Sequence, residues 1–227
     1  MHGVRANRVN MLERARFLAR AGYSVLLFDF QSHGESAGRR ITLGYLESRD
    51  ARASVNFVRA NTPGEKVGVI GVSMGGAAAL LASPPLEADA MVLEMVYPTI
   101  DQAVSDRLSV RFGNWSRVFT PLLTWQLRPR LGVSAAALRP IDRVGSIHTP
   151  KLFIAGAEDQ YTTLEESRQV FAAASEPKAL WVVSGAKHED LCRFAGKEYE
   201  QRILDFFGQN LNGSSKPIFI TPPAAIP

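Results

Sequence analysis

The chain has 227 residues, of which 46% are hydrophobic and 21% charged, and its formal net charge at pH 7 is +4. These values fit one globular domain with a sizeable core. The basic residues are scattered rather than gathered in a block with aromatics, so nucleic-acid binding is not predicted. The single cysteine, Cys192, excludes an internal disulfide and a cysteine-based zinc site. No apolar run approaches membrane-spanning length and no signal peptide is visible, so the cytoplasm is the default expectation for its location.

Strand and helix patterns alternate along the chain. Apolar runs predict strands at 23–30, 66–71, 90–96, 151–155 and 179–183. Helical patterns occupy 10–21, 43–60, 75–82, 164–174 and 197–210. This alternation predicts an α/β fold, with a mostly parallel twisted sheet and helices on both faces. The α/β domain is expected over 1–211, followed by a polar, proline-rich tail over 212–227.

A long insertion separates the third and fourth predicted strands. An irregular loop spanning 100–147 would be unusual in a compact domain, so a small helical cap is predicted there. The alternative is a set of extra helices packed on the core. The insertion is rich in large apolar side chains, which suggest a pocket for an acyl chain or an aromatic group. These residues are Trp115, Phe119, Leu122, Leu123, Trp125 and Leu127.

The motif Gly-x-Ser-x-Gly at 71–75 stands between a predicted strand and a helix of small residues. That context indicates a sharp strand-to-helix turn with Ser73 as the candidate nucleophile. Gly71 and Gly75 suit the turn because larger side chains would collide there. The backbone N–H of Met74, at the start of the helix, is placed to face a developing oxyanion.

Four further segments carry a resemblance. They are His2-Gly3, the loop 29–36 after the first predicted strand, Gly156-Ala157-Glu158-Asp159, and Gly185-Ala186-Lys187-His188. Together with the Ser73 motif, in this order, they make the chain resemble the α/β-hydrolase superfamily, particularly its small bacterial esterase-like members. The loop 29–36 departs from the family pattern, because Gln31 and Ser32 replace the usual Arg and Gly.

The resemblance implies a catalytic triad of Ser73, Asp159 and His188. His188 would take the proton from Ser73 and later return it to the leaving group, while Asp159 fixes the imidazole tautomer. Glu158, adjacent to Asp159, is an alternative acid. Glu94, at the end of the third predicted strand, is another; its structural interpretation is a buried or rim carboxylate paired with a cap residue such as Arg107.

The other histidines stand in poorer contexts for a base. His2 belongs to the oxyanion loop, His33 is expected to be structural, and His148 precedes a strand, which places it at the opposite edge of the sheet. The resemblance makes the N–H of Val4 the second oxyanion donor, after Met74. Cys192 is expected to be a small apolar filler, although its position close to His188 could bring it near the pocket.

The family has strands before the His-Gly loop that this sequence does not include. One of them normally lies between the strands predicted at 23–30 and 66–71, so a gap is expected there, with unpaired backbone groups on both sides. Either the sequence is a fragment of a protein that has these strands, or another segment fills the gap. The β-prone segment 216–221 is one candidate to fill this gap, from its own chain or from a neighbour in a swapped homodimer. The alternative interpretation of this segment is an unstructured or vector-derived tail.

The sequence therefore predicts a serine hydrolase that cleaves small carboxylic esters through an acyl-enzyme, without cofactor or metal. A peptidase or amidase with the same triad is the nearest alternative. Dehalogenase chemistry is disfavoured, because that branch places Asp where Ser73 stands. A catalytically inactive binding protein with the same fold is the rival from another class.

Overall fold

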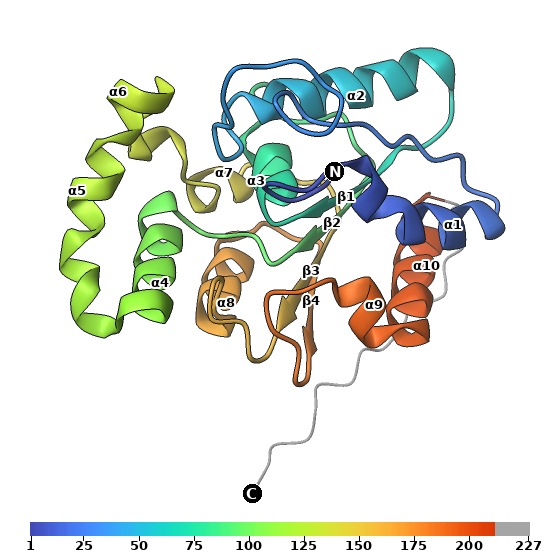
Figure 1. The fold of residues 1–227 in the computed structure, drawn as a ribbon. Helices are drawn as coiled ribbons and strands as arrows, with labels where there is room; N and C mark the ends of the chain where they lie inside the picture. The colour runs from blue at the N-terminus through green and yellow to red at the C-terminus, as the bar shows by residue number, and fades with distance from the viewer. Residues whose placement is uncertain (212–227) are drawn as a thin grey trace, which may run out of the picture.

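Four parallel strands form one sheet, and they are adjacent in the order in which they occur along the chain (Figure 1). The computed structural model describes residues 1–211. The strands are β1 (Gly68–Val72), β2 (Ala90–Glu94), β3 (Lys151–Gly156) and β4 (Lys178–Val183). The register pairs Val69 with Met91, Val92 with Leu152 and Ile154 with Trp181. The predicted α/β class is confirmed, and four of the five predicted strands are present.

Successive residues of the central strands point to opposite faces, and each face carries its own hydrophobic core. One core gathers Met91, Leu93 and Phe153 with α2 (Glu47–Asn61), α3 (Met74–Leu81) and α8 (Leu164–Ala173). The other gathers Val92, Leu152 and Ile154 with α1 (Leu12–Arg20), α9 (Leu191–Ala195) and α10 (Lys197–Leu211). A short 3₁₀ turn, Arg8–Met11, leads into α1. This two-layered covering follows from the period-two alternation of strand side chains.

The prediction of a strand at 23–30 is wrong, because this segment has no regular secondary structure. A groove of about 160 Å³ separates it from β1, lined by Leu27 and Phe28 on one side and by Val67 and Val69 on the other. Without a neighbour in this slot, the segment lacks the ladder of hydrogen bonds that defines a strand. Among the described residues, Met1 pairs with the end of β1 in this slot: Met1 N donates to Ile70 O (2.8 Å) and Val72 N donates to Met1 O (3.1 Å).

The insertion 100–147 is helical, with short connections between its elements. It comprises α4 (Ile100–Phe112), a 3₁₀ helix at Asn114–Phe119, α5 (Thr120–Trp125), α6 (Leu127–Leu131), a 3₁₀ turn at Ala135–Ala137 and α7 (Ile141–Val144). Figure 1 shows α4, α5 and α6 standing to one side of the sheet, with α5 and α6 outermost. Among residues 1–211, no helix combines the length and the apolar character needed to cross a membrane. The predicted tail strand 216–221 lies outside the described residues.

Candidate active site

Ser73 occupies a strained turn between β1 and α3. Its backbone angles are φ 49° and ψ −112°, a conformation that a non-glycine residue adopts rarely and at a cost on the order of 1–3 kcal/mol. The turn is tied to the sheet because Ser73 N donates to Glu94 O (2.8 Å). A Cβ at Gly71 would lie 2.7 Å from the backbone of Gly76, and one at Gly75 would lie 2.6 Å from Met1 O. The glycines are thus required by close backbone approach.

Two backbone N–H groups predicted as oxyanion donors lie beside Ser73. Met74 is the first residue of α3, so its N–H has no acceptor within the helix and sits at the positive end of the helix dipole. Val4 follows Gly3, whose position is fixed close to Ser73: a Cβ on Gly3 would be 3.7 Å from the Ser73 Cβ. Val4 and Ser73 line the same cavity.

The loop containing Val4 is held by His2, which is completely buried. The ring Nδ1 of His2 lies 2.8 Å from Gly3 O, and its Nε2 accepts the Phe30 N–H at 3.1 Å. These contacts assign the proton to Nδ1, and burial lowers the pKa of His2 to about 4. His2 is therefore a neutral structural residue. His33, also buried, contacts it edge to face, in agreement with the structural role expected for His33.

Asp159 and His188 lie together at the carboxyl ends of β3 and β4. The distance between His188 Nδ1 and Asp159 Oδ2 is 2.7 Å. The other carboxylate oxygen of Asp159 accepts the N–H groups of Tyr161 (2.8 Å) and Thr162 (2.9 Å). Asp159 is buried, whereas its neighbour Glu158 is exposed. The pair leaves Nε2 of His188 as the nitrogen that can act on a substrate.

Two cavities meet at Ser73. The larger, of about 400 Å³, is lined by Ser73, His188, Val4 and Tyr161, among others. The smaller, of about 100 Å³, is lined by Ser73 and the predicted oxyanion donors Val4 and Met74, with Leu43, Tyr97, Ile100, Ala103, Val104 and Arg107. Because a general acid must reach the leaving group, the larger cavity, which contains His188, suits the leaving alcohol. The smaller cavity, on the side of the N–H donors, suits a short acyl group.

The cap contributes to these cavities differently from the sequence prediction. Ile100, Ala103 and Val104, from the first turns of α4, line the smaller cavity. None of the six large apolar residues singled out from the sequence lines either cavity. Trp115 and Trp125 are instead 67% and 73% exposed. The prediction that these side chains form an acyl pocket is therefore wrong, because five of them are exposed and Leu127 packs against the hydrophobic core.

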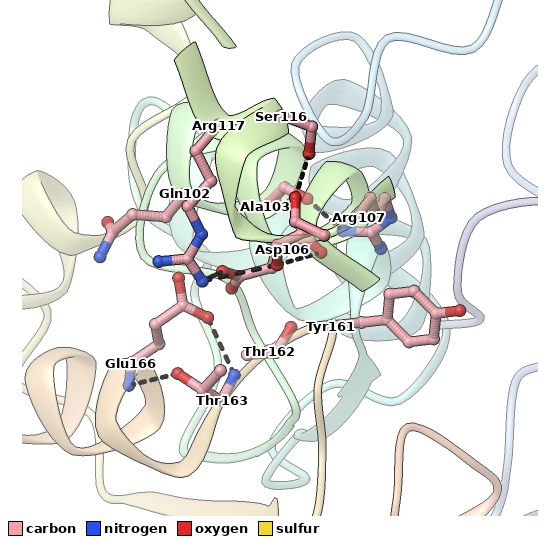
Figure 2. A network of polar contacts seen from close by, with 12 residues as sticks. Gln102, Ala103, Asp106, Arg107, Ser116, Arg117, Tyr161, Thr162, Thr163 and Glu166 are labelled. Atoms are coloured by element: carbon pink, nitrogen blue, oxygen red, sulfur yellow. Dashed lines mark hydrogen bonds and ion pairs between the residues drawn. The ribbon is translucent and has the colours of Figure 1, made fainter. Parts of the chain in front are cut away.

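Glu94 is buried in an ion-pair network away from the His188–Asp159 pair. Arg14 of α1 binds it through Nε (3.0 Å) and a terminal nitrogen (2.8 Å), and the Tyr199 hydroxyl donates to it at 2.5 Å. Arg14 also pairs with Asp190 (2.8 Å), two residues after His188. The predicted pairing of Glu94 with Arg107 is wrong. Arg107 donates a hydrogen bond to Ala103 O, and its guanidinium lies 5.5 Å from the centre of the Tyr161 ring (Figure 2).

Sequence reasoning missed Arg14 and Tyr161. Arg14 lies on the apolar face of an amphipathic helix, at helical spacing from the buried residues Phe17 and Leu18. An arginine at such a position is the sequence signal that could have indicated a buried ion pair. Tyr161 contacts His188 edge to face, with ring centroids 5.8 Å apart. Cys192 is buried, and burial raises the pKa of its thiol to about 12. Cys192 is therefore an unreactive residue that fills space in the core, which agrees with the expectation of a small apolar filler.

Within residues 1–211, no group of three or more histidine, cysteine, aspartate or glutamate side chains is arranged to hold a metal ion.

The sheet, the turn at Ser73 and the order of the loops are those of the α/β-hydrolase fold, which the chain shares with solved esterase structures. Residues 1–97 match the family described as serine aminopeptidase S33. Among solved structures, it is similar to the esterase Pf2001 of Pyrococcus furiosus, with a TM-score of 0.74 and 26% identity, covering 93% of this chain and 81% of that one. A monoacylglycerol lipase of Paleococcus ferrophilus shares the fold, with a TM-score of 0.64 and 18% identity, covering 92% and 93%.

Two curated relatives are similar in sequence. The uncharacterized protein YqkD of Bacillus subtilis is 26% identical over 95% of this chain and 72% of its own length. The uncharacterized protein Rv2307c of Mycobacterium tuberculosis is 28% identical over 83% of this chain. The chain spans 61% of the length of that mycobacterial relative. These similarities place the chain among hydrolases and leave its substrate to be argued from the site.

Proposed function

We propose that this protein is a serine hydrolase that cleaves small carboxylic esters through an acyl-enzyme on Ser73. The observation that carries the proposal is that Ser73, on its strained turn, and His188, bound to Asp159, line one cavity. A hydroxyl is a weak nucleophile at neutral pH and needs such a base.

In the first step, His188 Nε2 accepts the hydroxyl proton as Ser73 Oγ attacks the ester carbonyl carbon. The N–H groups of Met74 and Val4 stabilise the negative charge on the carbonyl oxygen, and each donor of this kind contributes on the order of 3 kcal/mol. Collapse expels the alcohol, which takes the proton from His188. Water then attacks the acyl-enzyme by the same route, which releases the acid and restores Ser73.

The esterase proposal is supported by the similarity to the Pyrococcus furiosus esterase, which is 26% identical over 93% of this chain. A fluorophosphonate probe should label the protein once, and peptide mapping should place the adduct on Ser73. Ser73→Ala should abolish both labelling and the hydrolysis of p-nitrophenyl acetate. An adduct on another residue, with Ser73→Ala still active, would overturn the assignment.

A peptidase or amidase with the same residues is the second candidate, favoured by the family that matches residues 1–97, described as a serine aminopeptidase. Aminoacyl p-nitroanilides distinguish the two activities. An esterase should show a kcat/KM on p-nitrophenyl acetate far above that on alanyl p-nitroanilide. The reverse order, lost in Ser73→Ala, would identify the aminopeptidase instead. No hydrolysis of either substrate and no labelling would identify an inactive binding protein.

A further inference from the structure

The outer part of the helical insertion exposes a set of large apolar side chains. We call residues 107–131 the cap arm; it runs from the second half of α4 through α5 and α6 and forms one side of the molecule (Figure 1). The exposed apolar side chains are Val110, Phe112, Trp115, Val118, Phe119, Leu122, Leu123 and Trp125. Val118 and Trp125 are both 73% exposed. A group of large apolar side chains exposed along one segment indicates an interaction site.

In the cap arm, polar side chains face the protein and apolar side chains face solvent, the reverse of the usual arrangement in a helix exposed to water. Ser116 of the 3₁₀ helix and Thr120 and Thr124 of α5 are all buried, and the two threonines, four residues apart, share one face of α5. Ser116 donates to Gly113 O, whereas the Thr120 hydroxyl has no partner among the described residues. Hydroxyls thus face the protein and apolar groups face outward, the reverse of the amphipathic pattern expected for a helix in water. The outward face is built for an apolar contact.

The charge of the cap arm is of one sign. It contains five arginines and no aspartate or glutamate; the arginines are Arg107, Arg111, Arg117, Arg128 and Arg130. All five are exposed, and only Arg117 has an acidic partner, Asp106, at 3.4 Å among the described residues (Figure 2). A partner for this surface must therefore combine apolar material with negative charge.

We propose that the cap arm docks on an anionic lipid bilayer. Trp115, Val118 and Trp125 would enter the boundary between headgroups and acyl chains, where tryptophan is favoured. Arg128 and Arg130, at the end of the cap arm, would contact the anionic headgroups, since arginine can bury its stem and keep its charge at the interface. Short helices lying in the plane of the interface satisfy their own backbone hydrogen bonds and need not cross the bilayer.

A second copy of the chain fits this surface less well. A two-fold interface places the same patch on both partners, so the exposed arginines of two cap arms would face each other, and among the described residues Asp106 is their one acidic partner, at Arg117. Like charges at this density oppose association. An anionic bilayer supplies both the apolar layer and the missing negative charge. The docking does not depend on ester hydrolysis, so it can be tested in the Ser73→Ala protein.

The test is flotation with vesicles of phosphatidylcholine alone and with vesicles containing phosphatidylglycerol at about three parts in ten. We expect binding to the anionic vesicles at low salt, a strong loss at high salt, and little binding to the neutral vesicles. The fluorescence of Trp115 and Trp125 should shift to the blue on binding, because both side chains leave water. The third tryptophan, Trp181, is already buried and should not contribute to the shift.

Paired variants separate the two contributions. Trp125→Ser with Val118→Ser removes apolar surface, and Arg128→Gln with Arg130→Gln removes charge; each pair should lower the vesicle partition coefficient by about tenfold or more. The matched controls are Phe57→Ser and Arg49→Gln, exposed positions on α2, which should bind as the parent does. Circular dichroism verifies that each variant is folded.

Three outcomes would overturn the proposal. Equal binding to neutral and anionic vesicles would remove the role of the arginines. Absence of binding to either vesicle would leave an acidic protein as the partner of the cap arm. A parent dimer that Trp125→Ser converts to a monomer would identify a second copy as the occupant.

Discussion

Asp159 and Glu158 are adjacent, yet the structure gives them different surroundings. Asp159 is buried against His188 and accepts two backbone N–H groups, whereas Glu158 faces solvent. We therefore predict that Asp159→Asn lowers kcat for p-nitrophenyl acetate by on the order of 10⁴-fold, because the amide stabilises the wrong histidine tautomer. Glu158→Gln is the matched control and should change kcat less than about threefold. A larger loss in Glu158→Gln would show that the acid is misassigned.

Glu94 differs from both carboxylates because its charge is already matched by Arg14 inside the protein. Glu94→Gln would leave the Arg14 guanidinium buried without its principal counterion. We predict a loss of about 3–5 kcal/mol in the free energy of unfolding, measured in urea, with kcat of the folded protein changed far less than in Asp159→Asn. A kcat loss as large as that of Asp159→Asn, without loss of stability, would make Glu94 the catalytic acid.

At the residue scale, the sequence was informative wherever a motif ties residue types to a turn. The crowding around Gly71 and Gly75 can be expected from the motif alone, since a sharp strand-to-helix turn admits only glycine there. The partner of Glu94 could not be predicted in this way. Arg14 is separated from Glu94 by 80 positions, and nothing local in the sequence shows which of the 26 basic residues meets that carboxylate.

At the scale of elements, the cap is joined to the core through a pair of acidic side chains. Asp106 of α4 faces Glu166, the third residue of α8, which also accepts the Thr163 N–H at 2.9 Å (Figure 2). Burial, together with the Asp106 carboxyl, raises the pKa of Glu166 to about 8. The folded protein therefore favours the protonated form of Glu166 at this contact between α4 and α8.

This contact predicts a pH-dependent stability. The pKa of Glu166 is about 8 in the folded protein, against an ordinary value of 4.5. The contribution of Glu166 to stability is therefore complete below about pH 4.5 and is lost as the pH rises through 8. The free energy of unfolding should fall by on the order of 1 kcal/mol or more between pH 6 and 9. Glu166→Gln should remove this slope, while the control Glu165→Gln, at an exposed neighbour, should keep it. A slope unchanged in Glu166→Gln would refute the assignment.

The smaller cavity predicts how the cap affects substrate choice. Val104 and Met74 both line this cavity, which has a volume of about 100 Å³. Val104→Phe should fill this space and lower the kcat/KM for p-nitrophenyl butyrate by about tenfold relative to the acetate, because overpacking a closed site excludes extra methylenes. Trp125→Ala, in the exposed part of the cap, should leave the ratio unchanged. Equal losses on both esters in Val104→Phe would indicate a packing role only.

Helices were easier to predict than the orientation of the cap. The sequence predicts α8 and α10 within about two residues because their apolar positions recur at helical spacing. The same reasoning failed for Trp115 and Trp125, since large apolar residues were expected to face the protein. Their exposure depends on how the short cap helices lie against α4, which is decided by tertiary contacts rather than by local pattern.

At the scale of the whole molecule, the segment 23–30 shows why strand prediction from local pattern can fail. Its apolar run is typical of a buried strand, but a strand exists only where a neighbour accepts and donates its hydrogen bonds. Here the neighbouring position is a groove, and Val25 and Leu26 are 38% and 41% exposed. The expected gap beside this segment thus corresponds to a real feature, and the rest of the parallel sheet forms without it.

The groove beside β1 is the place where the tail segment 216–221 is predicted to bind. Phe207 and Leu211, at the end of α10, line the groove, so the tail segment 216–221 starts within a few residues of it. A buried backbone group without a partner costs on the order of 1 kcal/mol, and a strand in the slot would supply such partners to β1. We predict that deletion of 214–227 lowers the free energy of unfolding and weakens phosphonate labelling of Ser73, and that Ile218→Ser with Ile220→Ser does the same without shortening the chain.

Size-exclusion chromatography would reveal a swapped dimer by its conversion to a monomer on deletion. A truncated protein that is equally stable, monomeric like the parent and fully labelled would show that the tail leaves this groove open.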